Sequence, residues 1–105
     1  MIKQVFMVKR KAGMSFEEFK KYYFGVHAPL VKKSFPEISK YVVNLAVQRP
    51  GKETAYDAIT EICWPDFETL LKIAKSDTYK NVIRPDEERF LGDSQVILTE
   101  EYIQK

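Results

Sequence analysis

MSFEEFKKYYFGVHAPL, residues 14–30, is the stretch that decides the fold, because it holds the clearest helix signal in the chain. Ser15 followed by Glu18 forms a capping box, in which each side chain accepts a backbone N–H that the helix leaves unpaired. Met14 and Phe19 have the spacing of a hydrophobic staple. Apolar residues recur at intervals of three and four along one face: Phe16, Phe19, Tyr23, Val26 and Leu30. The pattern predicts an amphipathic helix that begins at Ser15.

Pro29 disturbs this predicted helix. Proline has no N–H to donate to the carbonyl of Gly25, and its ring crowds that carbonyl. We therefore expect a kink or a restart of the helix between Gly25 and Pro29, with His27 inside it.

Segments on either side of the helix have the patterns of strands and of a second helix. Asp66 is a candidate N-cap for a helix that carries Phe67 and Leu70. Residues 76–90 predict a short helical piece and a connection broken at Pro85, and no internal repeat is evident. Strands are expected at Ile2–Lys9, Ile38–Gln48, Tyr56–Trp64 and Ser94–Tyr102. The order β-α-β-β-α-β predicts an α+β, ferredoxin-like split β-α-β fold with a four-stranded antiparallel sheet.

Length and composition limit the classes of function. A chain of 105 residues fits a single domain, residues 1–105, and its 45% hydrophobic content is that of a globular protein. One cysteine and one histidine can form neither an internal disulfide nor a closed zinc site, so no metal or cofactor is expected. A net charge of +2 does not suggest a nucleic-acid partner. No apolar run is long enough to cross a membrane, so we expect a cytoplasmic protein with no membrane partner.

The predicted strands are apolar on both faces. Val5–Val8, Tyr41–Val43 and residues 96–98 lack the alternation that a sheet with one solvated face shows. Two helical segments can cover only one face of four strands. The pattern therefore predicts a homodimer, with sheet packed against sheet about a two-fold axis.

His27 is the first candidate catalytic residue, because imidazole titrates near neutral pH and the ring borders the apolar face of the disturbed helix. Two interpretations remain open. The ring is either packed, donating to a carbonyl freed by the kink such as that of Gly25, or it is an acid–base group beside a pocket between helix and sheet.

Polar and aromatic residues of the expected strands and helix are further candidates. Glu61 in mid-strand needs a partner, either an ion pair with a residue such as Arg10 or a role in binding. Tyr41 and Asn44 are candidates for hydrogen bonds to a ligand carbonyl, and Tyr41 could act beside His27. The expected ligand-binding residues are Tyr23, Asn44, Glu61, Phe19 and Trp64.

The chain resembles the EthD-like domain from about Lys9 to Glu101. The similarity rests on the stretch 9–19, on the segment His27-Ala28-Pro29-Leu30, on Tyr41 with Asn44, on the strand 56–64 and on residues 86–91. The resemblance implies a dimeric α+β barrel that holds a small hydrophobic ligand between the helix and the sheet of each subunit. Relatives include accessory proteins of ether-degrading oxidation systems, isomerases, cyclases, dehydratases and cofactor-free monooxygenases.

Three functions are compatible with these observations. The first is a cofactor-independent enzyme that acts on a small cyclic or aromatic carbonyl compound, with His27 moving a proton and Tyr41 or Asn44 binding the oxyanion. The second is a non-catalytic accessory protein or ligand carrier in a degradative oxidation pathway. The third, suggested by distant relatives that bind haem through one histidine, is haem binding through His27.

Overall fold

Four strands pair into one antiparallel sheet in the computed structural model, which describes residues 1–105. The strands are β1 (Ile2–Arg10), β2 (Lys40–Leu45), β3 (Ala58–Trp64) and β4 (Leu91–Thr99), and their order in the sheet is β2-β3-β1-β4. The predicted ferredoxin-like arrangement is confirmed. Strand ends differ from the expectation by a few residues: β2 and β3 are shorter than predicted, and β4 begins at Leu91 instead of Ser94.

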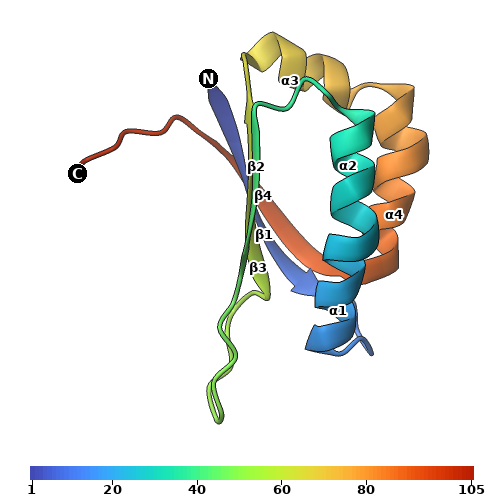
Figure 1. The fold of residues 1–105 in the computed structure, drawn as a ribbon, viewed down its shortest axis with the longest axis vertical. Coiled ribbons are helices and arrows are strands. Elements are labelled where there is room, and N and C mark those ends of the chain that lie inside the picture. The colour runs from blue at the N-terminus through green and yellow to red at the C-terminus, as the bar shows by residue number, and fades with distance from the viewer.

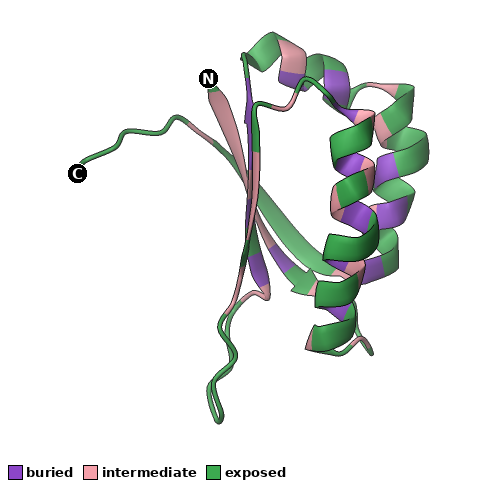
Figure 2. Ribbon diagram, in the orientation of Figure 1, coloured by how far each residue is buried: buried purple, intermediate pink, exposed green.

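All helices lie on one side of this sheet (Figure 1). The first helical segment consists of α1 (Phe16–Tyr22), a π-helical turn η1 (Tyr23–His27) and α2 (Ala28–Ser34). The second consists of α3 (Phe67–Ala74), a π-helical turn η2 (Tyr79–Ile83) and α4 (Arg84–Phe90). Both groups of helices carry buried residues among exposed ones (Figure 2).

Local capping explains where α1 and α3 begin. The Glu18 amide donates to Ser15 Oγ over 3.1 Å, and the Ser15 amide donates to Glu18 Oε1 over 2.9 Å, so the predicted capping box is present. Asp66 caps α3 by accepting from the Thr69 amide over 2.8 Å, as expected. The two predicted helix starts are therefore confirmed.

The disturbance at Pro29 takes the form of a π turn. The Ala28 amide donates to the Tyr23 carbonyl, five residues back, and α2 continues through Pro29 near its N-terminus, where a missing N–H costs little. Pro85 has the same place after η2, where the Arg84 amide donates to the Tyr79 carbonyl. The expected break at Pro85 is therefore wrong, because this proline begins a helix.

The two π turns share a sequence motif that was not recognised as a repeat. Residues 23–29 read YFGVHAP and residues 79–85 read YKNVIRP, so both follow the pattern Tyr-x-x-Val-x-x-Pro. Each copy folds into a π turn that passes directly into an α-helix. The two halves of the fold thus repeat one local structure.

The core lies between the helices and the sheet, in two clusters. One cluster is centred on Trp64 of β3 and the other on Phe19 of α1, which is fully buried. The opposite face of the sheet has no helix over it, and Ile59 and Ile97 on that face are 44% and 53% exposed. No helix is long and apolar enough to cross a membrane.

Candidate functional site

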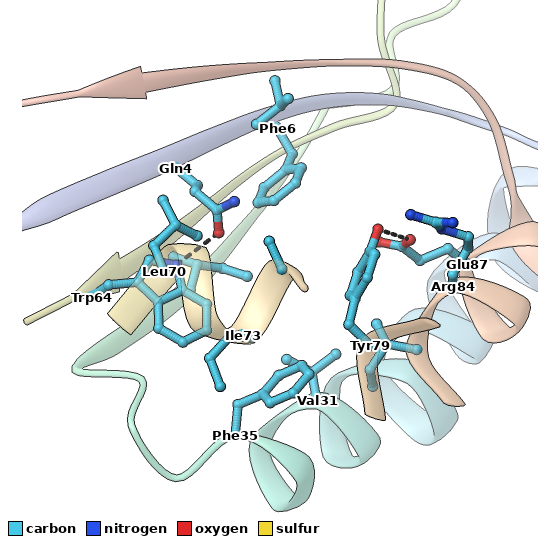
Figure 3. A pocket seen from close by; sticks show the side chains of 14 residues that line it. Gln4, Phe6, Val31, Phe35, Trp64, Leu70, Ile73, Tyr79, Arg84 and Glu87 are labelled. Atoms are coloured by element: carbon cyan, nitrogen blue, oxygen red, sulfur yellow. Dashed lines mark hydrogen bonds between the residues drawn. The ribbon is translucent and has the colours of Figure 1, made fainter. Parts of the chain in front are cut away.

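A cavity of about 260 Å³ opens between the sheet and the helices, within the cluster around Trp64 (Figure 3). For comparison, an apolar cavity of roughly 150 Å³ can hold benzene, so this one has room for a substituted aromatic ring. Eleven of its 14 lining residues are hydrophobic. They come from β1, β3, β4, α2, α3 and η2 and from Phe35 directly after α2: Phe6, Val31, Phe35, Ile62, Trp64, Leu70, Ile73, Ala74, Tyr79, Ile83 and Val96.

Glu87 is the carboxylic acid in the wall of this cavity. The Tyr79 hydroxyl donates to Glu87 Oε1 over 2.9 Å, and the Arg84 guanidinium lies over the Tyr79 ring, 5.2 Å from its centroid. Burial raises the pKa of Glu87 above its ordinary value, and the hydrogen bond from Tyr79 only partly opposes this effect. The cavity therefore combines an apolar wall with the carboxyl group of Glu87 and the guanidinium group of Arg84.

Gln4 brings a second polar group to the cavity from the sheet. Its Oε1 accepts a hydrogen bond of 2.7 Å from the Trp64 indole N–H. Because the indole can only donate, this bond leaves the amide nitrogen of Gln4 as a free donor. Figure 3 shows Gln4 and Glu87 on different sides of the cavity, with Phe6 between them.

His27 forms a buried pair with Asp86 of α4. Its Nδ1 lies 2.8 Å from Asp86 Oδ2, and the exposed fractions of the two residues are 5% and 3%. The Tyr22 hydroxyl donates to Asp86 Oδ1 over 2.5 Å, and Arg89 lies 3.6 Å from the same oxygen. The partner of His27 is thus the carboxylate of Asp86 and not the carbonyl of Gly25.

The pairing sets the chemical state of His27. Asp86 accepts a hydrogen bond from the Nδ1–H group of His27, so in the neutral ring Nε2 carries no proton and has a free lone pair. Burial lowers the pKa of His27, and Asp86 opposes that shift without reversing it. Nε2 has no hydrogen-bond partner in the chain. Every fully buried side-chain nitrogen and oxygen has such a partner, so Nε2 is not fully buried and is accessible.

A chain of hydroxyls connects the surroundings of His27 to the sheet. The Tyr23 ring packs edge-on against His27, with ring centroids 5.8 Å apart, and its hydroxyl lies 2.5 Å from Thr60 Oγ1. The Tyr41 hydroxyl also hydrogen-bonds Tyr23, and burial is the main reason that the pKa of Tyr41 is far above its ordinary value. Both tyrosines therefore stay protonated and can donate.

The predicted site residues divide between the two faces of the sheet. His27, Tyr23, Tyr41 and Trp64 lie on the helical side, and Trp64 lines the cavity. Phe19 is also on that side, but it is fully buried in the aromatic cluster with Phe90 and lines no cavity.

Asn44 and Glu61 lie on the other face of the sheet, away from His27. Asn44 donates to Glu61 Oε2 over 3.0 Å, and Glu61 pairs with Lys3 over 2.9 Å. Arg10, the predicted partner of Glu61, instead pairs with Asp57 over 2.9 Å. This placement separates Asn44 from the oxyanion position that the sequence analysis assigned to it.

Two functional candidates were missed in the sequence, Asp86 and Glu87. They are adjacent residues in the first turn of α4, directly after Pro85. An acidic pair after a proline is a helix N-terminus signal that was available in the sequence. It would have predicted the helix, but not that one carboxylate reaches His27 and the other the cavity.

Comparison with known proteins shows the family. The model of the EthD domain matches residues 11–94. Dehydratase ustZ of Ustilaginoidea virens is 30% identical over 95 residues, covering 77% of this chain and 68% of that protein.

Solved structures show the same fold. An EthD family protein from Bacillus halodurans superimposes with a TM-score of 0.78 at 25% identity, over 97% of this chain and 99% of that one. A dimeric protein of ferredoxin-like fold from Bacteroides fragilis has a TM-score of 0.67 at 12% identity, with 95% of each chain covered. With most of its length matched by the domain model, the chain belongs to the EthD family.

Proposed function

We propose that this protein binds a small cyclic or aromatic carbonyl compound in the cavity and catalyses a cofactor-independent proton transfer at the carbon next to the carbonyl. The observation that carries this proposal is the His27–Asp86 pair, which leaves an accessible, unprotonated Nε2 on a buried ring. A positioned base of this kind contributes roughly 10²–10⁴-fold to a rate. The resemblance to a dehydratase supports chemistry of this class.

In the proposed reaction the reacting carbon extends from the cavity to His27 Nε2, which takes the proton, and the carbonyl compound becomes an enolate with its negative charge on the oxygen. Asp86 keeps the ring oriented and stabilises the imidazolium that forms. The Tyr23 ring packs against His27, and the protonated hydroxyls of Tyr23 and Tyr41 supply hydrogen bonds to the oxyanion. The same imidazolium can return the proton to a leaving hydroxyl, which completes a dehydration, or to another carbon, which completes an isomerisation.

A specific observation favours a second function, that of a carrier or accessory protein. His27 is not among the residues that line the cavity, so the cavity alone can retain an apolar ligand without any reaction. A carrier needs the cavity and no base.

Exchange of hydrogen for deuterium separates the two functions without knowledge of the substrate. Acetophenone is incubated with the protein in D₂O, and the loss of its methyl proton signal is followed by NMR. The enzyme is expected to accelerate exchange, and His27→Gln is expected to abolish the acceleration while acetophenone still binds. Binding is followed by the indole N–H resonance of Trp64, the chain's only tryptophan, which lines the cavity. Binding without exchange in the unmodified protein would reject the enzyme and leave the carrier.

We further propose that the active form is a homodimer whose subunits pack their open sheet faces together. The apolar side chains of Val5, Ile59 and Ile97 on that face support this assembly, as does the dimeric state of one structural neighbour. Light scattering at micromolar concentration should give about twice the chain mass. Ile97→Asp should give a monomer, whereas Val82→Asp, at an equally apolar exposed position on η2, should not. A monomeric unmodified protein would reject the dimer.

A further inference from the structure

Glu87 differs from its neighbour Asp86 in having an oxygen left over. Both oxygens of Asp86 are taken, by His27 and by Tyr22. Glu87 Oε1 accepts from Tyr79, but Oε2 has no partner, and no buried polar side-chain atom in the structure is unpaired. Oε2 is therefore accessible, and since Glu87 lines the cavity, a bound molecule can reach it.

A hydroxyl is the group that matches this carboxyl in both of its protonation states. A carboxylate accepts a hydrogen bond, whereas a carboxylic acid donates one from the oxygen that carries its proton. Burial raises the pKa of Glu87, with Tyr79 and Arg84 opposing the shift and Asp86 and Glu88 reinforcing it, so the protonated state is more accessible than in an exposed glutamate. A ligand hydroxyl donates to the first state and accepts from the second. A ketone or a carboxylate matches only the second.

Gln4 selects the other end of the ligand. Its free amide N–H group needs an acceptor, and a ketone or lactone carbonyl supplies one. The wall between Gln4 and Glu87 is made of aromatic and aliphatic side chains, which favour a planar apolar body.

We propose that the cavity selects neutral hydroxyaryl ketones and their enol counterparts, with the hydroxyl bound by Glu87 and a second carbonyl, separate from the one that reacts, bound by Gln4. This inference rests on the proposed function, because it assigns the substrate class of the same cavity. It gives Glu87 a role in binding the ligand that is separate from proton transfer by His27.

Three matched probes test the proposal by isothermal titration calorimetry at pH 6: acetophenone, 4-hydroxyacetophenone and 4-acetylbenzoate. The hydroxyl compound should bind about tenfold more tightly than acetophenone, the effect of one hydrogen bond to a charged group. The carboxylate should bind more weakly than either. The indole N–H resonance of Trp64, which bonds Gln4, should shift with each bound probe and so place it in the cavity.

Variants at Glu87 then separate recognition from folding. Glu87→Leu should bind 4-hydroxyacetophenone and acetophenone with about equal affinity, and its affinity for acetophenone should equal that of the unmodified protein. Glu87→Gln retains a partner for Tyr79 and should keep part of the preference. The matched control Glu37→Leu changes an exposed glutamate that lines neither this cavity nor the adjoining hollow beside Glu87, and should leave the preference unchanged.

The outcomes distinguish this inference from the proposed function. Equal affinity for acetophenone and 4-hydroxyacetophenone, or a preference that survives Glu87→Leu, would overturn it while the cavity remained a ligand site. Tightest binding of 4-acetylbenzoate would overturn it in favour of an anion site governed by Arg84. If none of the probes shifts the Trp64 resonance, the ligand-binding proposal itself fails.

Discussion

The π turns η1 and η2 have the same motif and the same backbone, but they differ in what surrounds them. The first ends in His27, a buried ring bonded to Asp86, and the hydroxyl of its tyrosine shares a buried hydrogen bond with Thr60. The second ends in Ile83, and its tyrosine bonds Glu87 at the wall of an open cavity. In the first copy, which we call the sealed region, the tyrosine and the histidine are buried apart from His27 Nε2, whereas the second copy lines the cavity and is the open region.

Two adjacent carboxylates of α4 account for much of this difference. Because consecutive helical residues point about 100° apart, Asp86 reaches the first π turn and Glu87 the cavity beside the second. The repeated backbone therefore supplies two equivalent positions, and the carboxylates of α4 decide whether a position holds a buried ring or meets the cavity. Each prediction below makes the same change on both sides of this comparison.

Truncation of the two carboxylates should show the largest contrast. Asp86→Ala leaves Tyr22 and the buried Nδ1 of His27 without an acceptor and should lower the free energy of unfolding by about 3 kcal/mol. Glu87→Ala should cost about 1 kcal/mol or less, since water can replace it at the cavity wall. Urea unfolding at one fixed protein concentration measures both. Equal costs would show that the two carboxylates are equally structural.

Removal of the two tyrosine hydroxyls should show a smaller contrast. Tyr23→Phe leaves Thr60, which is 2% exposed, and the hydroxyl of Tyr41 without a partner, and should cost about 2 kcal/mol. Tyr79→Phe should cost about 0.5 kcal/mol, because Tyr79 is half-buried and Glu87 keeps access to water. Thermal unfolding of the two variants checks the order. A greater loss in Tyr79→Phe would contradict the assignment of the first turn as the sealed one.

Elements that depend on neighbouring residues were predictable from the sequence. Ser15 and Glu18 are three residues apart, so their capping box follows from local spacing alone, and the same holds for Asp66 and Thr69. The strand order followed because the sequence of elements allows few topologies. The repeated π turn was also present in the sequence, but only three of its seven positions are identical, and a proline alone suggests a kink.

The candidate site was only partly predictable, because its bonds join distant residues. His27 and Asp86 are 59 positions apart, and nothing in either segment names the other as its partner. Asn44 and Glu61 are of residue types that often occur in binding sites, but the register of β2 with β3 places them on the face without helices. A strand pattern shows which residues share a face, and the face that the helices cover depends on packing of the whole chain.

The smallest expected effect is in the pH dependence of stability, where the two regions act in opposite directions. Burial lowers the pKa of His27 below its ordinary 6.5. As pH falls below 6.5 the unfolded chain takes up a proton that the folded chain does not, so the free energy of unfolding falls. Burial raises the pKa of Glu87 above its ordinary 4.5. As pH rises above 4.5 the unfolded chain releases a proton that the folded chain keeps, so the free energy of unfolding falls in that direction.

Between pH 4.5 and 6.5 the two contributions therefore oppose each other, and single variants should separate them. His27→Gln removes the term that rises with pH, so its unfolding free energy should increase less steeply with pH than that of the unmodified protein. Glu87→Gln removes the opposing term and should steepen the increase. Each change is bounded by about 1.4 kcal/mol per pH unit, the limit for one proton. Urea unfolding at pH 4.5, 5.5 and 6.5, with Glu37→Gln as an exposed control, gives the slopes. If the slope of unfolding free energy against pH changes in the same direction in both variants, His27 and Glu87 do not have opposite pKa shifts, and this contrast between the two regions is wrong.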